Sequence, residues 1–261
     1  MTRTLTKSVV FITGTFLGNN CWDEWKTYFE SKGYKCIAPA WPHKDADPEV
    51  LRNRHPDSAI ASTHLENLVE YYTDIVNTYT EKPILIGHSL GGLIVQLLLQ
   101  RGHGAAGVAV HSLPPLNTIK VKLSFLHAWW EAIGFFTTAR YTYMVSFRKW
   151  KHAFANEMSC EKQKELYYKY AIPESKQVIR DMFKCTEKIN FKIPHPPLLF
   201  TSGGYDRIIP AELNYNNYTN YKTGNSITDY KDFRYHNHLV FDKPACKEEA
   251  DFIFCWLQGI K

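Results

Sequence analysis

The sequence predicts an α/β fold in which helices cover both faces of a mostly parallel sheet of about six strands. Short apolar runs alternate along the chain with segments whose apolar residues recur at helical spacing. The run at residues 83–86 is apolar throughout, as in a strand covered on both faces, and this alternation is typical of parallel sheets. With 261 residues, 44% of them hydrophobic, the chain is long enough to bury one sizeable core.

Two strand-and-helix units precede that central run. Residues 8–12 are β-rich and end at a Thr-Gly-Thr turn, and aromatic residues at helical spacing follow over 22–29. A second strand is expected at 35–38, because Pro39 ends it. A helix is expected over 65–79, after a polar, proline-containing loop.

The remaining core elements follow the same rhythm, except for one long interruption. A helix is expected over 90–98, and the later expected elements are strands at 109–110, 198–200 and 226–233 and a final helix over 245–257. Residues 116–194 are instead crowded with aromatic side chains, with helical spacing over 123–133. We expect this stretch to be an inserted helical cap, which leaves residues 1–115 and 195–261 as the core.

Composition argues against several classes of partner. The formal net charge is only +5 and the basic residues are scattered, so no nucleic-acid partner is expected. No stretch approaches the length of a membrane span, and the apolar run at 9–12 is too short for a signal peptide. The widely spaced cysteines suggest reduced thiols in a cytoplasmic protein, expected to be a monomer or homodimer; they are Cys21, Cys36, Cys160, Cys185, Cys246 and Cys255.

A Gly-His-Ser-Leu-Gly motif at residues 87–91 joins the central strand to the following helix. In this setting a serine occupies a sharp, strained turn that lifts its hydroxyl clear of the sheet. The glycines leave room where the strand and the helix approach each other. A serine that merely caps the helix is the alternative, but a cap does not require both glycines. Ser89 is therefore the predicted nucleophile.

Four segments together resemble small capped bacterial α/β-hydrolases of the esterase and lipase type, and the resemblance covers nearly the whole chain. The segments are residues 13–22, 82–94, 197–210 and 238–257. This resemblance implies the α/β-hydrolase fold and an acyl-enzyme mechanism, with no metal and no organic cofactor.

The same resemblance implies an order of nucleophile, acid and histidine along the chain. Asp206 is the expected acid because it follows a late core strand; a surface ion pair with Arg207 or a helix cap are the alternatives. His238 is the expected base because the terminal helix follows it at the family's usual distance. His236 is the alternative base. A metal site on this His-x-His pair is a further alternative, although no carboxylate or third histidine lies close in sequence.

Backbone N–H groups are needed to stabilise the oxyanion that forms during acyl transfer. Leu90 directly follows the nucleophile, and Thr15 lies in the loop after the first strand, so these two are the expected donors. Most cap aromatics are expected to be ordinary packing. The residues expected to line a substrate pocket are Phe16, His88, Trp129, Trp130 and Phe136.

These expectations describe a metal-independent serine hydrolase acting on a small or amphipathic carboxylic ester or lactone. An aromatic cap suits an acyl chain with a compact polar head, and an acyl homoserine lactone, the substrate of quorum quenching, is the favoured specific guess. A cofactor-free lyase or C–C hydrolase on the same triad is one alternative, which a charged cap residue such as Arg148, Lys151 or His152 would support. A non-catalytic ligand receptor is the other.

Overall fold

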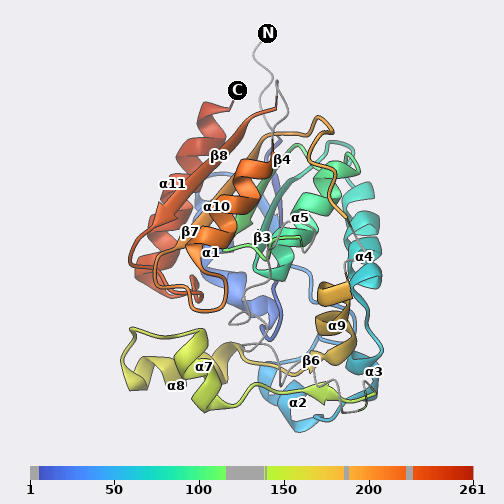
Figure 1. The fold of residues 1–261 in the computed structure, drawn as a ribbon, viewed down its shortest axis with the longest axis vertical. Coiled ribbons are helices and arrows are strands. Elements are labelled where there is room, and N and C mark those ends of the chain that lie inside the picture. Colours follow the sequence, from blue (N-terminus) through green and yellow to red (C-terminus); the bar gives the residue numbers. More distant parts are fainter. Residues whose placement is uncertain (1–5, 116–137, 139, 185–187, 222–225, 261) are drawn as a thin grey trace.

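The fold is known from a computed structural model that describes residues 6–115, 138, 140–184, 188–221 and 226–260 (Figure 1). Six strands form one sheet in the order β2-β1-β3-β4-β7-β8, and every neighbouring pair is parallel. This confirms the predicted α/β-hydrolase fold. The strands are β1 (Ser8–Ile12), β2 (Lys35–Ile37), β3 (Ile84–His88), β4 (Ala106–Val110), β7 (Leu198–Gly203) and β8 (Thr228–Phe233).

The central strands form the core, and the edge strands are partly exposed. Every residue of β3, β4 and β7 is buried, which explains the uninterrupted apolar run in β3. The short strand β2 and the mixed strand β8 lie at the two edges. Their polar residues fall where the sheet meets solvent.

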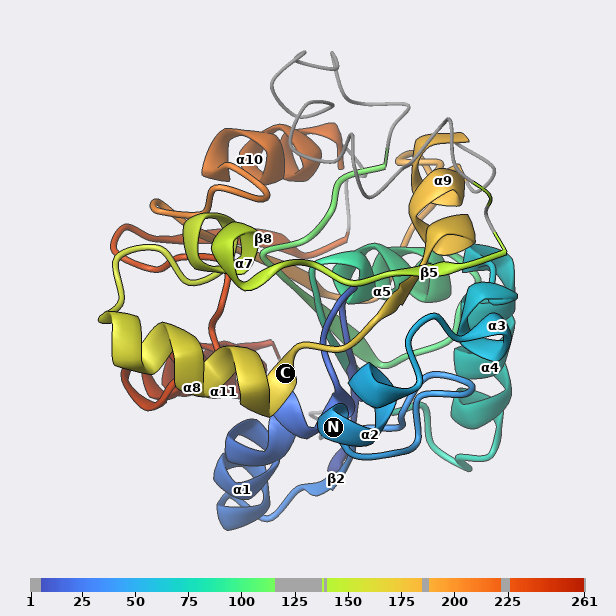
Figure 2. The same cartoon turned by 90° about the horizontal axis from the view of Figure 1, so that it is seen from below.

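Helices cover both faces of the sheet, as the alternating pattern predicted (Figures 1 and 2). On one face, α1 contacts α11, and an aromatic cluster around Phe11 lies beneath them. On the other face α5 contacts β3, β4 and α4, while α10 contacts β7 and β8. The helices and the short 3-10 helix that precedes α1 are η1 (Asn19–Trp22), α1 (Asp23–Ser31), α4 (Leu65–Asn77), α5 (Leu90–Gln100), α10 (Ala211–Asn220) and α11 (Lys243–Gly259).

The chain between β4 and β7 contains more than helices. Its described elements are β5 (Thr142–Tyr143), α7 (Phe147–Ala153), α8 (Cys160–Tyr170), β6 (Glu174–Ser175) and α9 (Lys176–Lys184). Strands β5 and β6 pair antiparallel, a small sheet that the sequence did not predict. The helical pattern at 123–133 lies outside the described residues, as do three predicted pocket residues, Trp129, Trp130 and Phe136.

The segment between β2 and α4, predicted as a loop, contains two short helices. They are α2 (Pro48–Asn53) and α3 (Ser58–Ala61). Pro48 begins α2, and the Asp57 side chain caps α3 by accepting from the N–H groups of Ala59 and Ile60. Because α2 contacts α8 and α3 contacts β6, these helices join the layer formed by the insertion (Figure 1).

This layer is fastened to the loop that follows β1. Gly18 N donates to Tyr170 O at 2.9 Å, and Ile172 N donates to Phe16 O at 3.0 Å. Leu17 and Ala171 form a β-bridge between the same segments. The insertion therefore lies against the carboxyl edge of the sheet, where the loops after parallel strands gather.

Two further sequence expectations concern cysteine chemistry and the membrane. The five cysteines within the described residues are free. None of the described helices combines the length and the apolar character that crossing a bilayer requires.

Candidate active site

Ser89 lies directly between β3 and α5 in a backbone conformation that non-glycine residues rarely adopt, with φ 57° and ψ −118°. Three backbone hydrogen bonds hold it there: Ser89 N donates to Val110 O at 2.9 Å, and Ser89 O accepts from Leu113 N at 2.9 Å and from Gly92 N at 3.0 Å. This is the strained turn that the motif predicted for a nucleophile.

Both glycines of the motif are required by close backbone approach. A Cβ atom on Gly87 would lie 2.2 Å from Gly91 O, and a Cβ on Gly91 would lie 2.1 Å from Ile12 O. Either substitution would push the helix away from the strands, so the spacing of these glycines places Ser89 at the sheet edge.

Asp206 is buried in the loop after β7, and its carboxylate accepts four hydrogen bonds. Oδ1 accepts from Ile208 N at 2.8 Å and from Ile209 N at 2.7 Å. Oδ2 accepts from His238 Nδ1 at 2.7 Å and from His111 Nδ1 at 3.1 Å. Burial opposes ionisation, but the two histidines outweigh it and hold the pKa of Asp206 well below its usual range.

Asp206 does not form the surface ion pair that was its alternative. Arg207 instead contacts Glu157 at 3.1 Å, on the exposed side of the loop.

His238 has the tautomer that a general base needs. Because Nδ1 donates to Asp206, Nε2 is left with its lone pair. Nε2 is buried and has no hydrogen-bond partner among the residues that the structure describes, Ser89 included. Catalytic contacts are often long before substrate binds. Within the described part of the chain, His236 forms no hydrogen bond with Asp206. His238 is therefore the histidine of the pair that contacts this carboxylate.

His88 supports the histidine loop from inside the core. Its Nε2 donates to His238 O at 2.8 Å, and the two ring centroids are 4.6 Å apart. Burial, followed by the charges of His238 and His111, holds the pKa of His88 well below its usual value, so the ring is a neutral donor. Its predicted place in a substrate pocket stays a prediction.

The two predicted oxyanion donors belong to segments that adjoin Ser89. Leu90 begins α5, where backbone N–H groups have no partner within the helix. The loop that carries Thr15 lies against Ser89, since a Cβ on the adjacent Gly14 would lie 2.8 Å from Ser89 Cβ.

Phe16, a predicted pocket residue, has a positive φ of 66° and is held by a residue that the sequence did not single out. Phe16 N donates to Glu174 Oε2 at 3.1 Å, and Glu174 Oε1 contacts Lys44 Nζ at 2.7 Å. Both charged side chains are buried, and the Lys44 ammonium also lies 4.2 Å from the centroid of the Trp41 ring. Burial lowers the pKa of Lys44, an effect that Glu174 opposes. The hydrogen bond from Phe16 N joins the loop after β1 to Glu174, and the ion pair joins the loop after β2 to the same side chain.

Residues from the chain between β4 and β7 also contact the histidine side of the site. The Phe154 ring lies 5.5 Å from the His238 ring and 6.2 Å from Phe16. Asn156 donates from Nδ2 to Tyr205 O at 2.9 Å, and its carbonyl accepts from Asn237 Nδ2 at 2.6 Å. One short cap segment thus joins the acid loop to the histidine loop.

A second group of buried ionisable residues lies behind Asp206. His111 Nε2 lies 3.0 Å from Glu249 Oε1, and the same oxygen lies 2.9 Å from His236 Nδ1. His236 Nε2 lies 2.9 Å from Glu248 Oε2. Neither a carboxylate nor a third histidine was predicted beside His236. In the folded chain, α11 supplies Glu248 and Glu249, and the loop after β4 supplies His111.

These groups have metal-ligand chemistry, but hydrogen bonds already join them. The ligand atoms of His111, His236 and Glu249 lie within 4.8 Å of one another, as do those of His111, Asp206 and His238. Within the first group, contacts of 2.9–3.0 Å pair one ring nitrogen of each histidine with Glu249 Oε1. The arrangement is therefore accounted for by charge-assisted hydrogen bonds.

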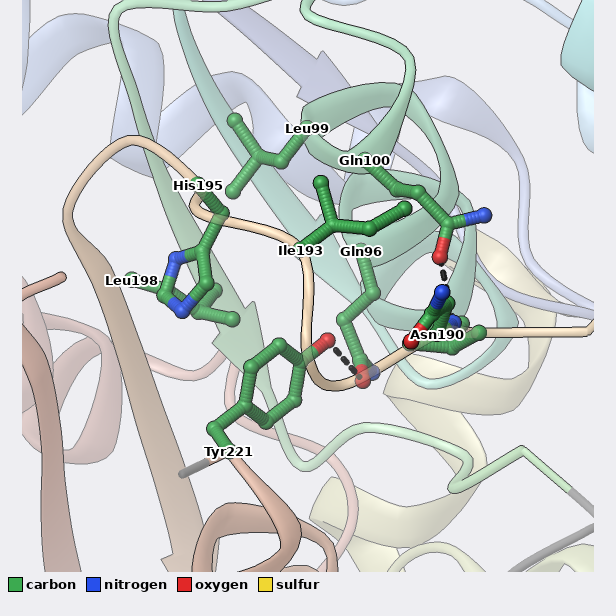
Figure 3. Close-up of a pocket in the computed structure, with 9 residues that line it drawn as sticks. Gln96, Leu99, Gln100, Asn190, Ile193, His195, Leu198 and Tyr221 are labelled. Carbon is green, nitrogen blue, oxygen red and sulfur yellow. Dashed lines mark hydrogen bonds between the residues drawn. The ribbon is translucent and has the colours of Figure 1, made fainter. Parts of the chain in front are cut away.

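One shallow pocket lies away from these residues (Figure 3). It encloses about 250 Å³, part of it open solvent, at the edge where β7 begins and α5 ends. Tyr221 donates across it to Gln96 Oε1 at 3.0 Å (Figure 3). Ser89 follows the opposite end of its strand, so this pocket is separate from the nucleophile. The lining residues are Gln96, Leu99, Gln100, Ile189, Asn190, Ile193, His195, Leu198 and Tyr221.

Solved structures confirm the fold at low sequence identity. A monoacylglycerol lipase of Paleococcus ferrophilus superposes with a TM-score of 0.67 at 18% identity, covering 98% of this chain and 96% of that one. An esterase of Exiguobacterium antarcticum superposes with a TM-score of 0.69 at 15% identity, covering 98% of this chain and 93% of that one. A variant of tomato methylketone synthase I, complexed with β-ketoheptanoate, superposes with a TM-score of 0.71 at 14% identity. The match covers 98% of this chain and 100% of that one.

The sequence itself identifies the family. No curated protein matches it. The model of the alpha/beta hydrolase family, however, matches residues 9–245, which span β1, the strained serine turn, the acid loop and the histidine loop. This chain therefore belongs to the alpha/beta hydrolase family.

Proposed function

We propose that this protein is a serine hydrolase that cleaves a carboxylic ester or lactone through an acyl-enzyme, with Ser89 as nucleophile, His238 as base and Asp206 as acid. The observation that carries the proposal is the 2.7 Å contact between Asp206 and His238 beside a serine held at φ 57°. A serine needs such a base, and the base needs a carboxylate that holds its tautomer.

The mechanism follows from the tautomer of His238. Nε2 accepts the Ser89 proton as Oγ attacks the carbonyl carbon, and Asp206 stabilises the imidazolium that forms. The N–H groups of Thr15 and Leu90 hold the oxyanion. His238 then returns the proton to the leaving alcohol, and water repeats the cycle to release the acid. No step requires a metal or a cofactor.

Aromatic side chains beside the triad support an acyl substrate. Phe16 lies 5.9 Å from Tyr143 and 6.2 Å from Phe154 between ring centroids, and Phe154 also contacts His238. An apolar wall at this position suits an acyl chain whose carbonyl reaches Ser89. We propose residues 116–194 as the cap that selects this chain, with acyl homoserine lactones as the favoured substrates.

The rival functions have less support. A lyase on the same triad would need a charged cap residue directed at the substrate, but Arg148 and His152 are exposed and Lys151 is only partly buried. A non-catalytic ligand receptor would bind its ligand without turnover, so it would not need a serine held beside a histidine and a carboxylate.

One assay separates these functions. Wild type, Ser89→Ala and His238→Ala are compared on short and long p-nitrophenyl esters and on a panel of acyl homoserine lactones, with and without EDTA. We expect EDTA-resistant turnover that falls at least about 1,000-fold in both variants. Ser62→Ala, an exposed serine at the end of α3, is the matched control and should retain full activity.

A fluorophosphonate probe gives a readout that does not depend on choosing the right substrate. It should label wild type and fail to label Ser89→Ala, because only an activated serine attacks phosphorus readily. Absence of both labelling and turnover would reject the serine hydrolase proposal in favour of the receptor. Turnover of simple esters without lactone opening would reject the lactone substrate alone.

A further inference from the structure

A chain of alternating charges runs from the protein surface to the acid of the candidate triad. It begins at the exposed Glu248 and passes through His236, Glu249 and His111 to Asp206, with each step spanning 2.9–3.1 Å. All members except Glu248 are buried. The Thr201 hydroxyl donates a hydrogen bond from Oγ1 to the second carboxylate oxygen of Glu249, Oε2, at 3.1 Å. Such an array in the core requires that every charge be matched.

The geometry determines the protonation state of His111. Nδ1 faces Asp206 and Nε2 faces Glu249, so each ring nitrogen must donate to a carboxylate. A neutral imidazole has only one N–H and would direct a lone pair at one of these oxygens. Burial disfavours the charged ring, but the two carboxylates outweigh it and raise the pKa of His111 to about 10.

The backbone around His111 leaves room for its imidazole ring. His111 has a positive φ of 44°, and its N–H donates to Thr201 O at 3.0 Å. A Cβ on Gly203 would lie 2.6 Å from His111 Cε1, so a glycine is required there. The ring is therefore held in place from β4 and β7 as well as by its two carboxylates.

We infer that His111 is a positioning residue that acts through Asp206. As a buried imidazolium, it donates to the carboxylate that orients His238 and holds that carboxylate in place. The inference rests on the proposed serine hydrolase function. The two rings contact the same carboxylate oxygen, Asp206 Oδ2, and their centroids are 6.3 Å apart. Removing His111 therefore leaves this oxygen with His238 alone to fix its position.

Several other ionisable groups surround these two rings. His111 faces Asp206, Glu249 and, beyond Glu249, His236; the ring of His88 lies 6.3 Å away. His238 faces Asp206, His88 and His111. Because His88 is neutral, His111 is the only described cation that adjoins the Asp206–His238 pair directly.

Steady-state kinetics on a p-nitrophenyl ester test the positioning of Asp206. In His111→Gln we expect kcat to fall by about 10-fold or more while KM changes little, because the substitution loosens the carboxylate that orients the base and touches no substrate. His195→Gln, the same change at the opposite sheet edge, should leave kcat in place. An unchanged kcat in His111→Gln, or a rise in KM alone, would overturn the inference.

The protonation state is tested without any activity. In ¹H–¹⁵N spectra of the imidazole groups of full-length wild type at pH 8, we expect both His111 ring nitrogens to carry protons. In Glu249→Gln, whose amide can donate to the ring, we expect one ring proton at this pH. A singly protonated His111 ring in wild type would refute the inference, even if Ser89→Ala had upheld the hydrolase. If Ser89→Ala keeps its activity, the hydrolase proposal fails while the spectrum still reports on His111.

Discussion

At the scale of single residues, the Asp206 carboxylate is the most constrained group of the site. Backbone N–H groups occupy Oδ1 and two imidazole N–H groups occupy Oδ2. Four donors hold the oxygens in place and stabilise the ionised form. The orientation of His238 therefore depends on a carboxylate that has little freedom to move.

Replacing Asp206 by Asn should separate geometry from charge. The amide would favour the wrong tautomer of His238, and we expect kcat to fall by about 10,000-fold while the fold is retained. Steady-state kinetics at pH 8 together with circular dichroism measure both effects. Arg207→Gln, which changes the exposed neighbour, is the control. A loss of less than about 10-fold in Asp206→Asn would contradict the assignment of the acid.

The buried imidazolium also predicts a pH-dependent stability. A histidine whose pKa is raised on folding stabilises fully below its unfolded pKa, and this contribution is lost as pH rises through the folded pKa. For His111 that window runs from about 6.5 to about 10. We expect the urea midpoint of wild type to exceed that of His111→Gln most at pH 6.5, and the difference to shrink toward pH 10. A difference independent of pH would contradict a charged His111.

At the scale of elements, one buried carboxylate in the strand β6 contacts both the loop after β1 and the loop after β2. Glu174 accepts from Phe16 N and contacts Lys44, while Ile172 and Gly18 complete the backbone contacts. The candidate oxyanion donor at Thr15 adjoins this junction. The layer over the site therefore positions the loop as well as covering it.

The Lys44–Glu174 pair should behave as a coupled unit. Glu174→Gln leaves a buried ammonium without its counter-ion, so we expect a loss of about 3 kcal/mol in the free energy of unfolding. Lys44→Met should lower the free energy of unfolding by a comparable amount, because it leaves the buried Glu174 carboxylate without its counter-ion. In the double variant most of the loss should be recovered, since no unpaired charge remains. Urea unfolding of the four proteins measures the coupling, and strictly additive losses would show that the pair is not coupled.

At the scale of the whole molecule, the core and the insertion share one hydrophobic cluster. Buried side chains continue without a break from β1 and β3 to Trp150, Phe154 and Leu166. Helices α2 and α3, from the chain before β3, contact the same layer. Ser89 is 3% exposed and His238 1% exposed beneath it. The molecule thus buries its candidate site between two parts that pack as one.

A shared cluster predicts a single unfolding transition. We expect the urea midpoints from far-ultraviolet circular dichroism and from tryptophan fluorescence to coincide, because Trp22 and Trp25 report on the core and Trp150 on the insertion. Trp150→Phe should leave the circular dichroism transition cooperative. An earlier fluorescence transition that disappears in this variant would show that the insertion unfolds separately.

The parts of the fold and site that could be predicted are those encoded by local pattern. The central strands were found because burial on both faces leaves an apolar run, and Ser89 because two glycines must flank its turn. The short helices α2 and α3 and the strand pair β5–β6 were missed. Elements of two to six residues carry too few periodic positions to distinguish them from loops.

The sequence by itself therefore determined the fold class and the strained turn at Ser89, and it pointed to the loops that carry Asp206 and His238. Each of these depends on neighbours within a few residues. Only the tertiary structure decided that His238 rather than His236 meets Asp206, and that His111 bridges Asp206 to Glu249. It also decided that Glu174 holds Phe16, 158 residues away in the chain. Hydrogen bonds at such separations depend on which loops the parallel sheet gathers at one edge, and this is a property of topology that no local spacing records.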